Sequence, residues 1–331
     1  MKLKNLLLLI ILAAVAGSAQ AQQPVKADTL IKKLDSLAKK TDSTGKQVNN
    51  IEPDAYNENT KLSPKAYFLL LGSSIKQEFT KPFHMKKRDW VNFGKFALVE
   101  GALFFADEPI QRNALDLRKN NTTVTNVSKY ITNFGATYEV YTLAAFEAYG
   151  LIFKSQKVKT TTLLATQAVV SAIVMEAVLK TLTGRTRPNY YGEGIEAEPR
   201  FQGPFANLKT SPSGTGSNSA FPSGHTTAAF AAATVFAVEY RNQPIIPIIA
   251  YTMATLVGIS RITENKHWTT DVLAGAALGY ITGRQISFNY HRYAKIKNGE
   301  ARDKAKNVKT HVSFNLQYNY GRLMPAMALH F

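Results

Sequence analysis

Two residues of this sequence have the types and the spacing that nucleophilic chemistry requires. His267 and Asp271 are four residues apart, so on a helix they would share one face. A carboxylate at one imidazole nitrogen fixes the tautomer and leaves the other nitrogen free as a nucleophile. Arg261 would add a guanidinium that binds phosphate through two parallel hydrogen bonds. An isolated His and Asp pair is more often a structural hydrogen bond, so the spacing alone leaves both interpretations open.

A second segment has the features of an anion site. The motif Pro-Ser-Gly-His occupies residues 222–225 and opens an Ala-rich stretch over residues 226–240. Ser223 is of a type preferred at the start of a helix, and Gly224 allows close approach of the backbone to a ligand. The free amides at a helix start bind anions, and His225 could give a proton to the leaving group of a bound anion.

A third segment is basic and closes the apolar stretch over residues 160–182. Lys180 and Arg187 are seven residues apart, which is two helical turns, so both could face one pocket. Pro188 then ends the element. A basic last turn that complements the helix dipole is the alternative interpretation of this segment alone.

Further charged residues lie near these positions. Glu176 precedes Lys180 by one turn, so its carboxylate could pair with the lysine at a site or only neutralise a buried cation. Arg185 and Lys266 lie beside the segments, and we expect both to be solvated surface charges. The remaining histidines match no pattern, and we assign no role to them: His84, His291, His311 and His330.

Long apolar segments would position these residues. These segments are rich in Ala, Leu, Val and Ile, which favours helices and hence an all-α fold. They recur near residues 66–80, 90–106, 137–153, 160–182, 226–240, 244–260 and 271–285. Several could span a membrane only if tilted or extended. Glu100, Glu147 and Glu176 lie inside three of them, and a carboxylate in lipid is costly unless it faces a bundle interior. A membrane-embedded bundle, a compact soluble bundle and a peripheral membrane protein therefore stay open.

The composition limits the possible functions. The 331 residues include no cysteine, which excludes disulfides, thiolate zinc sites, Fe–S clusters and a cysteine nucleophile. The apolar share of 45% is too high for a fully disordered chain. The formal charge of +17 indicates anionic partners, which could be nucleic acid, a membrane surface or phosphorylated substrates.

The N-terminal residues reduce this choice. Lys2 and Lys4 precede a short apolar run, and Ala19-Gln20-Ala21 has the form of a cleavage site, so residues 1–21 are predicted to be a secretory signal peptide. An uncleaved anchor is the alternative. An exported protein rarely meets nucleic acid, so phosphorylated lipids and membrane surfaces become the expected partners.

The C-terminal residues have a different pattern. Residues 292–309 are basic, and we expect them to be solvated. From Val312 to Tyr320, and again from Leu323 to Phe331, apolar and polar residues alternate, which predicts a short β-hairpin. A terminal aromatic residue resembles the last strand of outer-membrane barrels, but two strands cannot close a barrel. We therefore expect the hairpin to pack on the helical domain or to pair with a partner.

Together the three segments read K-x6-R-P, P-S-G-H and S-R-x5-H-x3-D, in this order. This set resembles the type 2 phosphatidic acid phosphatase (PAP2) superfamily, which includes vanadium-dependent haloperoxidases and bacterial class A acid phosphatases. The resemblance covers about residues 90–285. It implies a bundle of helices with the site among the helix ends.

The resemblance also implies roles for the motif residues. Lys180, Arg187 and Arg261 would hold the phosphate oxygens, and Ser223 with the Gly224 backbone would complete the cradle. His267 would attack phosphorus, Asp271 would orient His267, and His225 would act as general acid and base. No metal and no cofactor are implied. Three cations and backbone amides are also what a phosphoryl transition state needs, because it carries negative charge on its equatorial oxygens.

The sequence therefore predicts an envelope phosphatase that acts on a phosphomonoester or diphosphate, preferably of a lipid. Phosphatidic acid, phosphatidylglycerol phosphate, polyprenyl diphosphate and lipid A are candidates. The alternatives are a non-specific periplasmic acid phosphatase, a vanadate-dependent haloperoxidase and a non-catalytic envelope-binding protein. The site would face the periplasm. The oligomeric state has no signal in the sequence.

The predicted domain organisation has four parts. Residues 1–21 are the signal peptide and residues 22–62 a polar linker. Residues 63–291 form the helical phosphatase domain, with its motif core in residues 90–285, and residues 292–331 form the basic tail and the hairpin.

Overall fold

The computed structural model describes residues 62–191, 195–208, 217–306, 311–319 and 322–330. The predicted signal peptide and nearly all of the predicted linker lie outside these residues. The longer elements are helices, namely α3 (Pro64–Thr80), α4 (Lys87–Phe104), α5 (Asp107–Asn120), α6 (Thr122–Thr132), α7 (Thr137–Ile152), α8 (Gln156–Thr183), α9 (Gly224–Glu239), α10 (Ile245–Thr263) and α11 (Thr269–Lys306). Short 3-10 helices are η2 (Lys81–His84), η3 (Asn133–Gly135), η4 (Pro188–Tyr190) and η5 (Ala206–Leu208).

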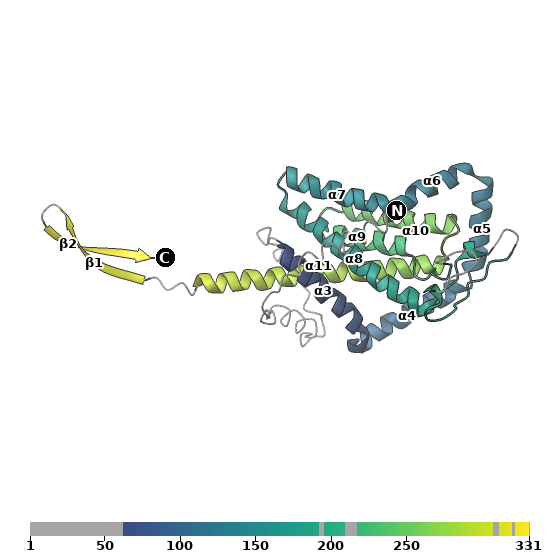
Figure 1. Ribbon diagram of the computed structural model, residues 1–331, viewed down its shortest axis with the longest axis horizontal. Helices are drawn as coiled ribbons and strands as arrows, with labels where there is room; N and C mark the ends of the chain where they lie inside the picture. Colours follow the sequence, from purple (N-terminus) through teal and green to yellow (C-terminus); the bar gives the residue numbers. More distant parts are fainter. Residues whose placement is uncertain (1–61, 192–194, 209–216, 307–310, 320–321, 331) are drawn as a thin grey trace.

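Helix α9 lies at the centre of the bundle. Its main neighbours are α8, α10 and α11. In Figure 1, α6 and α7 lie on one side of these four helices, and α3 and α4 lie on the other. The four central helices carry all three motifs at their ends, so their packing positions the candidate site.

A stripe of glycines brings α11 against α9. A β-carbon on Gly275 would lie 2.7 Å from the carbonyl oxygen of Ser223. On Gly279 and Gly283 it would lie 2.3 Å and 2.5 Å from carbonyl oxygens of α9. The two backbones therefore touch along one face, and any side chain at these positions would force them apart. This contact sets the start of α11 beside the start of α9, where the second and third motifs lie.

The core around these helices is built from small residues. The largest buried cluster contains alanines of α8 and α9 together with Leu70, Leu164, Ile286 and Tyr290. Small side chains allow helices to pack closely, so the bundle interior is dense near α8 and α9. The motif-bearing ends are held by this packing.

The predicted all-α bundle is confirmed, and the predicted helical segments correspond to α3, α4 and α7 to α11. Helices α5 and α6 were not predicted, because residues 107–132 are too polar for a long apolar run. Helix α11 continues through residue 291, the predicted end of the domain, and through most of the stretch expected to be a solvated tail.

The C-terminal strands pair as predicted. Strand β1 (His311–Asn319) runs antiparallel to β2 (Arg322–His330), with Phe314 opposite Met327. Figure 1 shows this hairpin beyond the end of α11, away from the helices. The expected packing of the hairpin on the helical domain is therefore not seen among the described residues.

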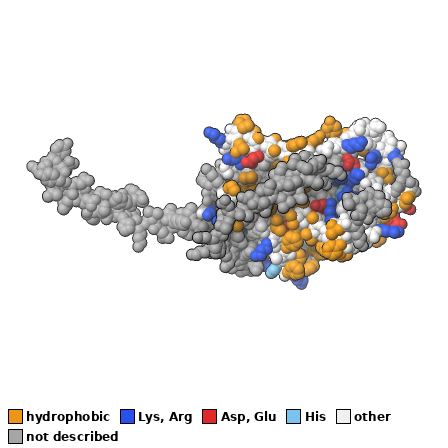
Figure 2. Space-filling view, viewed as in Figure 1, with side chains coloured by type: hydrophobic (Ala, Val, Ile, Leu, Met, Phe, Trp, Pro, Cys, Tyr) orange, Lys and Arg blue, Asp and Glu red, His pale blue; other side chains and the backbone are white. Residues whose placement is uncertain are grey.

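Many large apolar side chains lie on the outside of the bundle. Examples are Phe93 and Leu98 on α4, Ile152 on α7 and Ile248 on α10. Figure 2 shows hydrophobic side chains, in orange, on the visible face of the helical body. Among the described residues, α8 and α10 are the two helices long and apolar enough to cross a membrane by length and composition.

Candidate active site

The imidazole of His267 is buried just before α11 and has a defined tautomer. Its side chain is 2% exposed, and Nδ1 lies 2.8 Å from the carbonyl oxygen of Ala220. A carbonyl oxygen can only accept a hydrogen bond, so Nδ1 carries the proton and donates it. The other ring nitrogen, Nε2, therefore keeps its lone pair.

Asp271 lies behind His267 in the first turn of α11. Its Oδ2 is 3.6 Å from Nδ1 of His267 and accepts a hydrogen bond of 2.8 Å from the backbone amide of Trp268. Its Oδ1 is 2.5 Å from Nη1 of Arg185. Thus the structure brings Asp271 close to His267, but the hydrogen bond at Nδ1 goes to the carbonyl of Ala220.

Arg187 lies beside the unprotonated nitrogen of His267. Its Nη1 lies 3.5 Å from Nε2 of His267. The guanidinium is held in place because it donates to the hydroxyl of Ser219 and to the carbonyl oxygens of Ser219 and Lys266. A cation so placed beside Nε2 can receive the oxygens of a phosphoryl group that the nitrogen attacks.

The start of α9 supplies the second wall of the site. Ser223 is fully buried, and its amide donates to the carbonyl of Asp271 at 2.9 Å, which ties the second motif to the third. The first amides of a helix have no partner within the helix, so the turn that begins at Gly224 presents donors. His225 follows directly, and Gly135 of η3 packs against it with no room for a β-carbon.

Lys180 reaches the site from the last turn of α8. It forms an ion pair with Glu176, one turn earlier, and both side chains are largely buried. The helix ends at Gly184, which has φ +55° and would place a β-carbon 2.3 Å from the carbonyl oxygen of Gly203. Only glycine fits this left-handed position, so the chain can turn here and bring Arg187 back to the site.

Arg261 comes from the last turn of α10 and is 6% exposed. Its Nη1 donates to Glu264 at 2.8 Å and to the hydroxyl of Thr132 on α6 at 3.2 Å. These contacts hold the guanidinium at the end of the helix, where it interacts with the charge of Arg187.

The electrostatics show that the motif residues act on one another. The pKa of His267 is lowered well below its usual 6.5, first by burial and then by nearby positive charge. The residues that supply this charge, in order of effect, are Arg187, Lys180, Arg261 and His225. His267 is therefore neutral, as a nucleophile must be, and it lies in a field that attracts an anion.

Two nearby charged residues are less exposed than the sequence predicts. Arg185 was expected to be solvated, and this was wrong: its side chain is fully buried and paired with Asp107 and Asp271. Lys266, also expected to be solvated, is half-buried, and its carbonyl accepts a hydrogen bond from Arg187. Asp107 was missed altogether, because it lies in a polar stretch far from the motifs in sequence.

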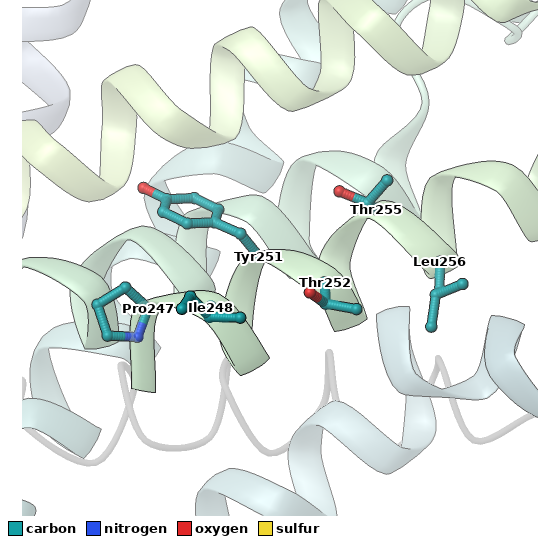
Figure 3. A pocket seen from close by; sticks show the side chains of 6 residues that line it. All are labelled: Pro247, Ile248, Tyr251, Thr252, Thr255 and Leu256. Atoms are coloured by element: carbon teal, nitrogen blue, oxygen red, sulfur yellow. The ribbon is translucent and has the colours of Figure 1, made fainter. Parts of the chain in front are cut away.

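A separate hollow of about 510 Å³ lies along α10, lined by Pro247, Ile248, Tyr251, Thr252, Thr255 and Leu256 (Figure 3). None of the motif residues lines it, and its side chains offer no acid, base or cation. The motif residues lie instead at the helix ends. Among the described residues no group of three or more His, Cys, Asp or Glu is placed to hold a metal ion.

Comparison with known families agrees with these motifs. The family model of the PAP2 superfamily matches residues 160–295, a range that contains every residue of the three motifs. This segment of the chain is similar to the PAP2 superfamily, so the resemblance predicted from the sequence is confirmed.

Two curated relatives are similar over shorter ranges. The chain is 50% identical over 80 residues to the lipid A 1-phosphatase of Porphyromonas gingivalis, covering 24% of this chain and 17% of that protein. It is 32% identical over 145 residues to lipid phosphate phosphatase 1 of Arabidopsis thaliana, covering 38% of this chain and 42% of that protein. The chain thus spans less than half the length of either relative.

Two solved structures also match. One is a transmembrane PAP2 type phosphatidylglycerolphosphate phosphatase from Bacillus subtilis, with a TM-score of 0.40, 22% identity and coverage of 66% of this chain and 96% of that chain. The other is LpxE from Aquifex aeolicus, with a TM-score of 0.40, 23% identity and coverage of 55% and 94%.

Proposed function

We propose that this protein is a phosphatase that hydrolyses a phosphomonoester or diphosphate of a lipid through a phosphohistidine on His267. The observation that carries the proposal is the unprotonated Nε2 of a buried, neutral His267, which lies 3.5 Å from the guanidinium of Arg187. A nucleophile beside a cation in a buried site is what attack on a phosphoryl group requires.

The phosphate would be held by three cations and by the start of α9. Lys180, Arg187 and Arg261 would neutralise the oxygens, and the amides from Gly224 onward would donate hydrogen bonds to them. Ser223 would complete this cradle. Its hydroxyl lies 2.9 Å from that of Thr226, which limits its rotation.

The reaction would proceed in two displacements. In the first, Nε2 of His267 forms a bond to phosphorus while the bond to the leaving oxygen breaks, and His225 gives that oxygen a proton. In the second, His225 takes a proton from water, whose oxygen attacks phosphorus and breaks the P–N bond. Phosphate leaves and both histidines return to their starting states. Asp271 stabilises the positive ring of the intermediate.

A lipid is the favoured substrate for two reasons. Both curated relatives have names that describe lipid phosphatases. Large apolar side chains also cover the outside of α4, α7 and α10, as a lipid-facing surface would require. We place the protein in or on a membrane of the cell envelope, with the site facing the periplasm. The four-part domain organisation given above is part of this proposal.

The decisive experiment compares the purified full chain with its His267→Ala variant. Phosphate release would be measured from lipid phosphates in detergent micelles and from the soluble ester p-nitrophenyl phosphate, with and without chelator. His84→Ala is the matched control, because His84 is an exposed histidine whose ring bonds the carbonyl of Thr80 in its own helical turn. We expect lipid hydrolysis that His84→Ala retains and His267→Ala abolishes.

Other outcomes would identify the alternatives. Release from the soluble ester alone indicates a non-specific acid phosphatase. Halide oxidation that requires vanadate and peroxide indicates a haloperoxidase. No release that depends on His267 rejects the phosphatase, and loss of activity with chelator rejects the metal-free mechanism. Release of the protein from membranes by alkaline carbonate would reject spanning helices.

A further inference from the structure

Arg185 lies behind the candidate site and is not one of the motif positions. Its Nη1 is 2.5 Å from Oδ1 of Asp271, and its Nη2 is 2.6 Å from Oδ2 of Asp107. All three side chains are fully buried. One guanidinium thus bridges a carboxylate of α11 and a carboxylate of α5.

Aromatic rings enclose this guanidinium. The rings of Phe104, Phe201 and Trp268 have their centres 5.3 Å, 4.9 Å and 5.6 Å from its central carbon. They exclude water, and without water the attraction between Arg185 and its two carboxylates is screened much less than at the surface. The position of Arg185 is therefore strongly defined.

Asp107 anchors the assembly to α11 from the other side. Its Oδ1 accepts the backbone amide of Thr270 at 3.0 Å, and its Oδ2 accepts the hydroxyl of Thr270 at 2.5 Å. Nη1 of Arg185 donates to the same hydroxyl at 2.6 Å. The first turn of α11 is thus fixed to α5 and to the loop after α8 through one buried network.

This network reaches the nucleophile through Asp271. One oxygen of Asp271 is held by Arg185, and the other accepts the amide of Trp268 and lies 3.6 Å from Nδ1 of His267. The carbonyl of Arg185 also accepts the amide of Ala220, whose own carbonyl binds Nδ1 of His267. Both groups at Nδ1 of His267 are therefore placed by Arg185.

We propose that Arg185 and Asp107 are positioning residues for the nucleophile: they hold Asp271 and the Ala220 carbonyl at Nδ1 of His267, so that the ring keeps its tautomer and its positive intermediate is stabilised. The proposal rests on the phosphatase function proposed above. Neither residue touches the phosphoryl group.

The charges around Asp271 predict how each variant shifts its titration. Burial raises the pKa of Asp271 to about 6, Arg185 opposes this rise, and Asp107 adds to it. The charged and titratable groups that act on Asp271 from the surrounding elements are Arg185, Asp107, Glu100, His267, Lys180 and Arg187. Loss of Arg185 must therefore raise the pKa of Asp271, whereas loss of the Asp107 charge must lower it.

The test measures kcat and KM against pH for Arg185→Met, Arg185→Lys and Asp107→Asn. We expect Arg185→Met to lower kcat at pH 7 by about tenfold or more, with KM nearly unchanged. The acid limb of the pH profile, where kcat falls as the pH is lowered, should move up by about one pH unit. Arg185→Lys should restore part of kcat and should return the acid limb most of the way to its wild-type pH. Asp107→Asn should lower kcat but move the limb down. Arg112→Met is the control, because Arg112 pairs with Glu196 at the surface.

The outcomes separate this proposal from the proposed function. An inactive wild-type protein would reject the phosphatase and leave nothing to position. If the wild type is active, the proposal is overturned when the acid limb of all three variants stays at the wild-type pH. It is also overturned when the variants change KM without changing kcat. Opposite shifts in Arg185→Met and Asp107→Asn cannot come from a general loss of folding. If Arg185→Met does not fold, the downward shift in Asp107→Asn and the recovery in Arg185→Lys decide the result.

Discussion

The carboxylate of Glu176 fills the space beside residue 224 that the β-carbon of any other amino acid would need. A β-carbon on Gly224 would lie 2.5 Å from Oε1 of Glu176. The same carboxylate pairs with Lys180. Because α8 carries Glu176 and Lys180 whereas Gly224 opens α9, this contact joins the first motif to the second. The ion pair that the sequence allowed between Glu176 and Lys180 is therefore present, and it also sets the packing of the site.

The variant Gly224→Ala should disturb this contact. The added methyl would displace the carboxylate of Glu176 and with it the ammonium of Lys180, so we expect kcat/KM to fall by about tenfold. Phosphate release from the lipid substrate measures the effect. Gly101→Ala on α4 is the matched control, because a β-carbon there meets no atom within 4 Å. Equal activity in both variants would show that Glu176 yields without moving Lys180.

The variant Arg187→Lys tests the shape of the guanidinium separately from its charge. Arg187 donates to Ser219 and still has Nη1 beside Nε2 of His267. A lysine keeps the charge but not the planar fork, so we expect kcat/KM to fall by about tenfold or more. Steady-state kinetics measure kcat/KM for this variant and for the surface control Arg112→Lys. A variant with full activity would mean that only the charge matters.

The pH dependence of the reaction should have an acid limb near pH 6. Burial raises the pKa of Asp271 to about 6, so the carboxylate takes up a proton as the pH falls through this value. His267 contributes no limb in this range, because its pKa is lowered well below 6.5 and the ring stays neutral. Activity should therefore fall by about tenfold for each pH unit below the limb, measured as single-turnover phosphate release.

The variant Asp271→Asn assigns this limb. An amide does not titrate, so its activity should be low at neutral pH and should lack the limb near pH 6. If Asp271→Asn still shows an acid limb near pH 6, the titration belongs to another group. The amide still fills the site beside Arg185 and the Trp268 amide, which keeps the comparison close in shape.

The variant Gly279→Ala tests the packing of α9 against α11. A β-carbon here would lie 2.3 Å from the carbonyl oxygen of Thr227 and 2.8 Å from the amide nitrogen of Ala231. Both are backbone atoms that cannot turn away, so we expect a loss of stability of about 1–3 kcal/mol. Thermal unfolding in detergent measures it, with Gly72→Ala as the control because its β-carbon would meet nothing within 4 Å. An unchanged melting temperature would mean that the helices can separate freely.

The motif residues can be recognised from the sequence because the patterns that define them are local. Pro222 to His225 and Arg261 to Asp271 are short segments, and the spacing within each restricts how they can fold. The long apolar helices are predicted for the same reason. Helices α5 and α6 carry too few apolar residues to be recognised in this way, although α5 supplies Asp107.

The misjudged residue is Arg185, and the reason is physical. An arginine beside a turn is solvated unless carboxylates and rings from distant parts of the chain surround it. Asp107 lies 78 residues before Arg185 in the chain, and no periodicity connects the two. The role of the Ala220 carbonyl at His267 was likewise invisible, because a backbone group has no signature in the sequence.

The glycine stripe of α11 has a consequence for how the protein can vary. Since α9 and α11 meet through peptide groups at Gly275, Gly279 and Gly283, the relative height of their first turns depends on main-chain contact and not on the length of any side chain. The outer helices can then change their residues, and with them the apolar surface that the proposed lipid substrate would meet, while the spacing between His225 and His267 stays the same. The packing of the bundle therefore fixes the motif residues relative to one another independently of the side chains on its outer surface.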